Sequence, residues 1–266
     1  MILAVDIGNS VTLFGLFDET GKLSFRSALH TDRHATADQC ALQLQSVFQL
    51  YGAALHAVTG GILASVVPPL TGAMCAALER LTGKAPLVLG TGLRTGLDIR
   101  ADMHAQLGAD ILAGSVAAIA RYPGPVIVAD FGTAITFSVL QGNVYAGCAI
   151  LPGVRVSMEA LSQQAAELPH ISLNGPCDIL GHNTVDAMRS GAVYGYASLL
   201  DGMTARLEAA SAPAATVVAT GAGAMDILPQ CKRPIQYDPN LHLDGLYLLY
   251  QKNTEPRKRR GQGSQD

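Results

Sequence analysis

Two stretches of the chain share one pattern, in which a polar turn lies between two apolar runs. Residues 2–17 read ILAVDIGNSVTLFGLF, and residues 126–140 read VIVADFGTAITFSVL. Val, Ile and Phe favour extended, half-buried backbone, so each stretch is predicted to form two strands joined by a tight turn. An alignment without gaps predicts one hairpin that occurs twice, and it pairs Asp6 with Asp130, Gly8 with Gly132, Asn9 with Thr133, and Thr12 with Thr136.

The polar turns suit a phosphate tail. Gly8 lets the backbone fold sharply and brings amide groups near a ligand's oxygens. Asn9, Ser10 and Thr12 add side-chain donors. Asp6 lies at the carboxyl end of a buried strand, and it is predicted to hold a metal ion or its water, because two anions need a cation between them. Two such hairpins in one chain resemble the sugar kinase and actin superfamily, in which ATP lies in the cleft between two halves.

This resemblance implies an α/β fold of two duplicated actin-like (ribonuclease H-like) domains with a nucleotide cleft between them. We expect an N-terminal domain at residues 1–120 with the first hairpin and a C-terminal domain at residues 121–253 with the second. Residues 254–266 are polar and contain four consecutive basic residues, so we expect a disordered basic tail.

The periodicity between the hairpins predicts further strands and helices. Thr36 and Gln39 form a capping box, and apolar residues from Ala37 to Tyr51 recur at helical spacing, so a helix is expected there. Residues 90–96, GTGLRTG, lack the spacing of a dinucleotide fingerprint and are predicted to line a ligand cleft. Other expected elements are strands at 23–29, 61–67, 86–89, 144–150 and 216–220, and helices ending near 81 and 121, beginning near 154, and spanning 185–209.

Composition narrows the possible functions. The 266 residues are 49% hydrophobic and 15% charged, which is enough for two well-buried cores. The formal charge is −3 although residues 257–260 are all basic, so the rest of the chain is acidic and is not expected to bind nucleic acid. Apolar runs stay shorter than the roughly 18 residues of a membrane span, and the chain begins with a strand, so we expect a cytoplasmic protein. Five scattered cysteines predict reduced thiols.

Two candidate residues each have an ordinary and a chemical interpretation. Asp110 falls in the first turns of a helix, where the helix dipole favours a carboxylate, and it could equally be a catalytic base facing the cleft. Asn183 or Thr184 precedes the long helix and could simply cap it. His30 and His34 have no helical pattern and no third ligand, so metal binding there is not expected.

The order and spacing of several motifs identify the chain as resembling the type III pantothenate kinases, the family that includes the Bvg accessory factor proteins. The resemblance extends from Met1 to about Asn253. The motifs are DIGNS at 6–10, TDRHATAD at 31–38, SVVPPL at 65–70, TGLRTGLDIR at 91–100, GAD at 108–110, DFGTAITF at 130–137, PG at 152–153, GHNTVDAM at 181–188, SGAVYGY at 190–196, ATGAGA at 219–224 and DPNLHLDGL at 238–246.

The resemblance implies ATP-dependent phosphorylation of pantothenate to 4′-phosphopantothenate, the first step of coenzyme A biosynthesis. It implies Asp110 as the base, Asp6 near Mg²⁺, and Asp130 as a ligand of a monovalent cation, K⁺ or NH₄⁺. It also implies a homodimer. The implied ATP-binding residues are Asp6, Ile7, Gly8, Asn9, Ser10, Val11, Thr12, Leu13 and Thr133, and the implied pantothenate-binding residues are Gly108, Ala109, Asp110, Ile111 and Thr184.

The chain departs from the family pattern mainly around the acceptor. Ala101, Asp102, Met103 and His104 stand where the family usually has an aromatic residue followed by Asp-Asn-Pro. Ile111 replaces an arginine that could pair with the carboxylate of pantothenate. Ile135, Ser138 and Ala222 replace a Thr, an Asp and a Gly. Two alternatives therefore stand beside the pantothenate kinase: a nucleotide-binding regulatory paralogue with little kinase activity, and a kinase for another small hydroxylated acceptor.

Overall fold

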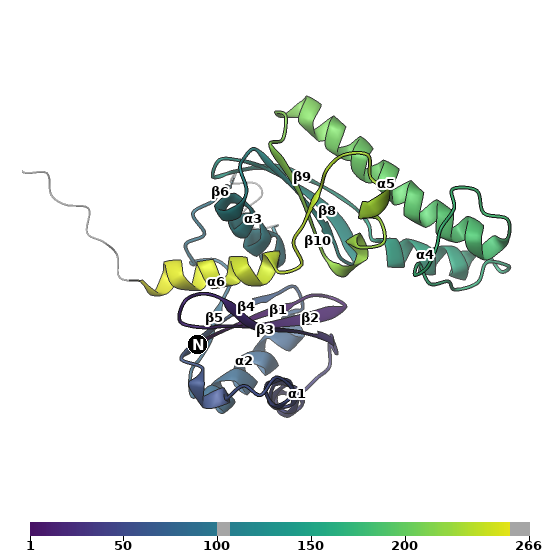
Figure 1. The fold of residues 1–266 in the computed structure, drawn as a ribbon. Helices are drawn as coiled ribbons and strands as arrows, with labels where there is room; N and C mark the ends of the chain where they lie inside the picture. The colour runs from purple at the N-terminus through teal and green to yellow at the C-terminus, as the bar shows by residue number, and fades with distance from the viewer. Residues whose placement is uncertain (100–106, 256–266) are drawn as a thin grey trace, which may run out of the picture.

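A computed structural model describes residues 1–99 and 107–255 of the chain. Two β-sheets lie one above the other, with helices on the outer face of each and two helices between them (Figure 1). Arg100 and the four substituted residues 101–104 lie outside the described residues, as do residues 256–266 of the predicted basic tail. The first residue of that predicted tail, Thr254, is instead the last residue of the final helix, because the helix continues one residue further than expected.

The first sheet has five strands in the order β3-β2-β1-β4-β5. Strands β1 and β2 form the first predicted hairpin, in which Asp6 lies opposite Leu13. Helices α1 and α2 cover the outer face, where Leu44 and Phe48 pack on Val5 and Phe14. The elements are β1 (Ile2–Ile7), β2 (Val11–Phe17), β3 (Leu23–His30), α1 (Ala37–Leu50), η1 (Leu55–Ala57), β4 (Gly60–Ser65), α2 (Pro68–Thr82) and β5 (Leu87–Val88).

The helix boundaries of this part have local causes. The predicted capping box is confirmed, because the Thr36 hydroxyl accepts from the Gln39 amide while the Gln39 side chain accepts from the Thr36 amide. Pro68 and Pro69 begin α2, since proline at the first helical position loses no hydrogen bond, while β4 already ends at Ser65, before the predicted end at residue 67.

The second sheet repeats the first. Its order is β11-β10-β7-β8-β9-β6, so a three-stranded antiparallel meander again lies beside a parallel strand, with β10 next to β7 as β4 is next to β1. The duplication predicted from the two hairpins is therefore confirmed. The elements are β6 (Asp98–Ile99), α3 (Ala109–Arg121), β7 (Val126–Phe131), β8 (Ala134–Gln141), β9 (Val144–Pro152), α4 (Val154–Gln164), α5 (Thr184–Ala210), β10 (Thr216–Thr220), η2 (Ala222–Ala224), η3 (Leu228–Gln230), β11 (Gln236–Tyr237) and α6 (Leu241–Thr254).

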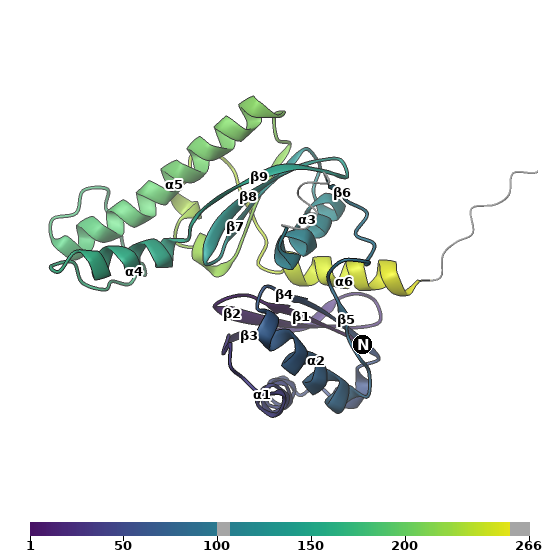
Figure 2. The ribbon, with the colours of Figure 1, turned by 180° about the vertical axis from the view of Figure 1, so that it is seen from behind.

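We call the first sheet with α1 and α2 the first lobe, and the second sheet with α4 and α5 the second lobe. Helix α5 packs on the outer face of the second sheet, where Ala197 and Leu200 meet Ile127 and Phe137. Figure 2 shows the same arrangement from behind, with α1 and α2 at one end and α4 and α5 at the other.

Helices α3 and α6 lie between the lobes. Leu243 and Leu246 of α6 pack on Ala4 and Ile62 of the first sheet, although α6 is the last helix in the chain. The two helices touch closely at Gly245, where a Cβ would lie 1.8 Å from the carbonyl oxygen of Ala113. Strand β6, in contrast, pairs with β9 of the second sheet. The domain boundary at residue 120 stays a prediction.

The glycine-rich loop at residues 90–96 lies against the end of α6. The Arg94 amide donates to Asn253 Oδ1 at 2.9 Å, and Lys252 Nζ donates to the carbonyl of Thr95 at 3.0 Å. His242 is at the opposite end of the same helix, roughly 15 Å away at 1.5 Å per residue. This loop therefore anchors the end of α6, and its predicted position along the ligand cleft stays a prediction.

Candidate active site

The first hairpin turn is held by hydrogen bonds within the first lobe. The Gly8 amide donates to the Val11 carbonyl at 3.0 Å, and the Thr31 hydroxyl donates to the Gly8 carbonyl at 2.8 Å. Thr12 is buried and its hydroxyl lies 2.9 Å from that of Thr31, so it stabilises the turn from inside. Ile7 is also buried, while Ser10 keeps its hydroxyl at the surface of the turn.

The second hairpin turn is supported by the Pro-Gly pair that precedes α4. The Gly153 amide donates to the Thr133 carbonyl at 3.0 Å. A Cβ at position 153 would lie 2.3 Å from the Gly132 carbonyl oxygen, so only glycine permits this close approach. The contact fixes where the turn and the beginning of α4 lie relative to each other.

The two turns face each other across the lobes. Ser10 Oγ of the first turn lies 3.0 Å from Thr133 Oγ1 of the second, so the two hydroxyls share a hydrogen bond. The aligned pair Asn9 and Thr133 therefore belongs to two loops that meet in space, which is the arrangement expected of a phosphate clamp.

His242 lies between the two aligned aspartates. Its Nδ1 is 3.1 Å from Asp6 Oδ2, and its Nε2 is 3.3 Å from Asp130 Oδ2. Burial disfavours the imidazolium, but the charge and hydrogen bond of Asp130, and then those of Asp6, outweigh it and raise the pKa of His242 well above its usual value. The ring is therefore a cation that neutralises two carboxylates from opposite lobes.

Asp110 is the second residue of α3, as the sequence predicted for a helix N-terminus. Burial raises the pKa of its carboxyl, and repulsion from Asp6 raises it further, while the charge of His242 opposes both. A carboxylate with a raised pKa beside two others is a better proton acceptor than a free one. Asp110 can therefore be both a helix N-terminal charge and a candidate base, because it lies in the first turn of α3 and near the carboxylates of Asp6 and Asp130.

Asp6 has the free ligand atom that a metal ion needs. Its Oδ1 is buried and accepts no hydrogen bond from the described residues, while its Oδ2 faces His242. Carboxylate oxygen is the donor that Mg²⁺ prefers, and kinases hold Mg²⁺ with one or two carboxylates plus the phosphates of the nucleotide. This fits the result that residues 1–99 and 107–255 contain no group of three or more His, Cys, Asp or Glu side chains able to hold a metal by themselves.

The chain neighbours of Asp110 at the beginning of α3 are mainly apolar or lack a side chain. Gly108 is the N-cap of α3 and supplies no side-chain cap. Ile111 packs in an apolar cluster with Ile99, Tyr145 and Leu241. The position where the family usually has an arginine is therefore an apolar contact in this chain.

Thr184 is the first residue of α5. The end of α5 that lies next to α4 is far from α3 in both views (Figures 1 and 2). Thr184 lines a cavity of about 700 Å³ between α4 and α5, whose other walls are Ser157, Met158, Leu161, Leu168, Ala187, Met188, Gly191, Ala192 and Tyr196. Within one chain, Thr184 is thus separate from Asp110.

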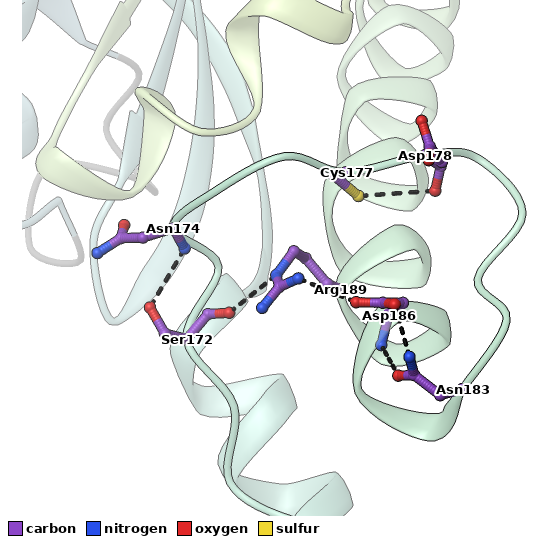
Figure 3. Close-up of polar contacts among 7 residues, drawn as sticks. All are labelled: Ser172, Asn174, Cys177, Asp178, Asn183, Asp186 and Arg189. Carbon is purple, nitrogen blue, oxygen red and sulfur yellow. Dashed lines mark hydrogen bonds and ion pairs between the residues drawn. The ribbon is translucent and has the colours of Figure 1, made fainter.

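The segment before α5 is fixed to the helix by polar contacts (Figure 3). Asn183 is the N-cap, since its side chain accepts from the Asp186 amide at 2.9 Å. Arg189 Nε donates to the Ser172 carbonyl at 3.2 Å, and its Nη1 lies 3.1 Å from Asp186 Oδ1. The capping interpretation is confirmed for Asn183, which leaves the Thr184 hydroxyl without a capping function.

Two residues of the candidate site were not predicted from the sequence. His242 lies within the DPNLHLDGL motif, but its type alone did not indicate a position between two aspartates. Arg155 follows the Pro-Gly pair, and its Nη2 donates to Ser10 Oγ at 3.0 Å. The only sequence signal for His242 and Arg155 as site residues is that they occur within or beside the family motifs.

Comparisons with known proteins identify the family of the chain. The family model for type III pantothenate kinase matches residues 2–206. A type III pantothenate kinase of Bacillus cytotoxicus is 37% identical over 263 residues, which covers 98% of this chain and 100% of the relative. In the described part of the chain, no helix has the length and hydropathy needed to cross a membrane.

Solved structures support the fold. A protein assigned to the Baf family of transcriptional activators, from Campylobacter jejuni, aligns with a TM-score of 0.57 at 19% identity and covers 94% of this chain and 98% of its own. A protein assigned as a 2-dehydro-3-deoxygalactonokinase, from Sinorhizobium meliloti, has the same TM-score at 14% identity, with 98% and 100% covered. The predicted actin-like, two-domain α/β fold is confirmed. The family model and the 37% identical relative together show that this chain belongs to the type III pantothenate kinase family.

Proposed function

We propose that this protein transfers the γ-phosphoryl group of ATP to pantothenate and forms 4′-phosphopantothenate, the first step of coenzyme A biosynthesis. The observation that carries the proposal is that His242 joins Asp6 to Asp130, with Asp110 near enough for their charges to act on the pKa of its carboxyl, in a chain of this family. Phosphoryl transfer depends mainly on positioning and on neutralisation of charge, and this cluster offers both at the junction of the lobes.

The nucleotide is proposed to lie along the first hairpin, at residues 6–13, with its phosphates between the two turns. From the first lobe, backbone amides and the side chains of Asn9 and Ser10 donate hydrogen bonds to the phosphates. From the second lobe, the Thr133 hydroxyl does the same. The 3.0 Å contact between Ser10 and Thr133 supports this, because one phosphate can reach both hydroxyls.

Two cations are proposed for the carboxylates. Asp6 holds Mg²⁺ through its free, buried Oδ1, and Asp130 holds K⁺ or NH₄⁺. When bound, Mg²⁺ neutralises charge on the phosphates. His242 keeps the two carboxylates at fixed positions on opposite lobes by hydrogen bonds to both.

Asp110 is proposed as the catalytic base. It accepts the proton of the primary hydroxyl of pantothenate as that oxygen bonds to the γ-phosphorus, and the bond from the γ-phosphorus to the bridging oxygen of ADP breaks. The raised pKa of Asp110 supports this assignment. Gly108, Ala109 and Ile111 line the acceptor beside it.

Thr184 is proposed to complete the acceptor site as part of a homodimer. The cavity between α4 and α5 is lined by the exposed side chain of Leu161, and Val185, next to Thr184 in the chain, is also exposed. A second copy would cover these apolar side chains. Light scattering on purified protein tests this: a mass of one chain would contradict the dimer. The cytoplasmic location stays a prediction.

The activity is tested with purified protein, ATP, Mg²⁺ and K⁺, with mass spectrometry of the product. We expect 4′-phosphopantothenate and ADP in equal amounts, and no product when pantothenate is omitted. Replacement of K⁺ by Na⁺ should lower the rate if Asp130 holds a monovalent cation. Failure to form product in conditions where a control kinase is active would contradict the proposal.

The apolar surroundings of Ile111 favour one alternative, a kinase for an uncharged hydroxylated acceptor. The same assay with the alcohol analogue, in which the carboxylate of pantothenate is reduced, separates the two. If the site offers a cation to the carboxylate, kcat/KM should be about tenfold or more higher for pantothenate than for the alcohol. Equal kcat/KM for both acceptors would favour the alternative, and ATP binding without transfer to any acceptor would favour a regulatory paralogue.

A further inference from the structure

Arg155 reaches from the second lobe to the first hairpin. It is the second residue of α4, directly after the Pro-Gly pair that supports the second turn. Its Nη2 donates to Ser10 Oγ at 3.0 Å, and that oxygen lies 3.0 Å from Thr133 Oγ1. The guanidinium therefore contacts the first turn directly, through the same hydroxyl that meets Thr133 of the second turn, at the point where the phosphates are proposed to lie.

The charges at this point are unbalanced. Asp6, Asp110 and Asp130 supply three carboxylates, and one imidazole, that of His242, lies between two of them. A triphosphate adds several negative charges, and repulsion between these anions would weaken its binding. A guanidinium beside the turn lowers that repulsion and offers two parallel N–H donors, which match the spacing of phosphate oxygens.

The existing contacts of Arg155 contribute little to the stability of the fold. The side chain is 64% exposed, and its ion pair with Glu159, at 2.7 Å, lies on one helix surface. Exposed pairs of this kind are weak because water and salt screen them. The contacts with Glu159 and Ser10 hold the guanidinium in position while leaving most of it open to solvent.

We propose that Arg155 binds the phosphates of the nucleotide. The proposal rests on the proposed function, since it requires a nucleotide between the hairpins. Before binding, Ser10 and Glu159 position the guanidinium, and on binding its N–H groups donate to phosphate oxygens at the mouth of the two turns. Arg155 thereby carries a positive charge from the second lobe to a nucleotide held mainly by the first.

The test compares adenosine, ADP and ATP, each with Mg²⁺, by isothermal titration calorimetry on the full chain. In Arg155→Ala, we expect unchanged affinity for adenosine and a loss of about tenfold or more for ATP, with ADP between or equal to ATP. Arg155→Lys keeps the positive charge but lacks the two parallel N–H donors, so it should recover part of the lost ATP affinity. The thermal midpoint without ligand should stay that of the wild type.

Arg80→Ala is the matched control. Arg80 is 62% exposed and pairs with one carboxylate, Asp38, on the far side of the first lobe. This variant should bind all three ligands as the wild type does.

Two results would overturn the inference, and a third would overturn the function beneath it. Unchanged ATP affinity in Arg155→Ala, with a wild type that binds ATP, would show that the arginine does not touch phosphate. An equal loss for adenosine and ATP, with a lower thermal midpoint, would show a structural link between the lobes. A wild type that binds neither ADP nor ATP would contradict the proposed function itself.

Discussion

Asp6 Oδ2 lies 3.1 Å from Nδ1 of His242, although 236 positions separate the two residues. The opposite nitrogen of the same ring lies 3.3 Å from Asp130 Oδ2. One helix at the end of the chain therefore joins the two copies of a duplicated hairpin. Movement of α6 would change the distance between the two turns, so the positions of the proposed metal ligands depend on this helix.

The Asp110→Asn variant tests the proposed base. Asparagine has nearly the same shape but cannot accept the proton, so kcat should fall by about 100-fold or more while ATP binds as before. Product formation and ATP affinity are measured on the same preparation. Asp98→Asn, at an exposed carboxylate on β6, is the control and should keep its activity. An Asp110→Asn enzyme within threefold of the wild type would exclude Asp110 as the base.

The His242→Ala variant should be less stable in metal-free buffer. It leaves two carboxylates facing each other without a cation, and loss of one partner of a buried charge pair costs about 3 kcal/mol. Mg²⁺ should recover more of the thermal midpoint in this variant than in the wild type, because a bound cation replaces the lost charge. His56→Ala, at an exposed position, should match the wild type. A variant as stable as the wild type without metal would refute the bridging assignment.

The Gly245→Ala variant tests the contact between α3 and α6. The added methyl would lie 1.8 Å from the carbonyl oxygen of Ala113, so the helices must separate, and we expect a loss of about 3 kcal/mol in the free energy of unfolding. Activity should fall too, because Asp110 and His242 lie on these two helices. Urea denaturation measures the stability.

A second glycine provides the comparison. Gly72 lies within α2 with nothing inside 4 Å of an added Cβ. Alanine there should stabilise the protein by about 0.5–1 kcal/mol, because it lowers the entropy of the unfolded chain. If both alanine variants lose the same stability, crowding between α3 and α6 is not the cause.

The stability of the interlobe helices should depend on pH through Asp244. Burial raises the pKa of its carboxyl to about 6, against the opposing charge of Arg121 and together with repulsion from Asp238. This pKa is above that of the same carboxyl in the unfolded chain. The protonated carboxyl of Asp244 therefore adds to the free energy of unfolding below about pH 4, and this stabilisation is lost as the pH rises through about 6.

The comparison with Asp244→Asn isolates this contribution. The asparagine does not ionise, so the unfolding free energy of the wild type should fall relative to the variant between about pH 4 and pH 7. Urea denaturation at several pH values measures the difference. A difference that is constant across this range would contradict the assignment to Asp244.

Much of the fold was predictable because its signals are local. The alternation of apolar residues around Asp6 and Asp130 predicts strands, and Gly8 and Gly132 predict the turns between them. Thr36 and Gln39 mark the beginning of α1 through contacts three residues apart. Each of these features depends on neighbours in the chain, so the sequence carries the whole signal.

The site was only partly predictable. Asp6, Asp110 and Asp130 could be selected from the sequence, because each lies at the end of a strand or the beginning of a helix, two positions from a glycine. The partners of these residues could not be selected. His242 looks like any other histidine until α6 is placed between the sheets. The sequence motif around Thr184 did not indicate that, within one chain, this residue lies beside a cavity between α4 and α5.

By itself, the sequence determined the two hairpins, the duplicated architecture and the family, since these depend on local periodicity and on motifs in a given order. Only the tertiary structure decided that His242 bridges Asp6 and Asp130, that Arg155 reaches Ser10, and that the glycine-rich loop anchors α6. The physical reason is that these contacts join segments up to 236 positions apart, and their formation depends on how α3 and α6 pack between the lobes.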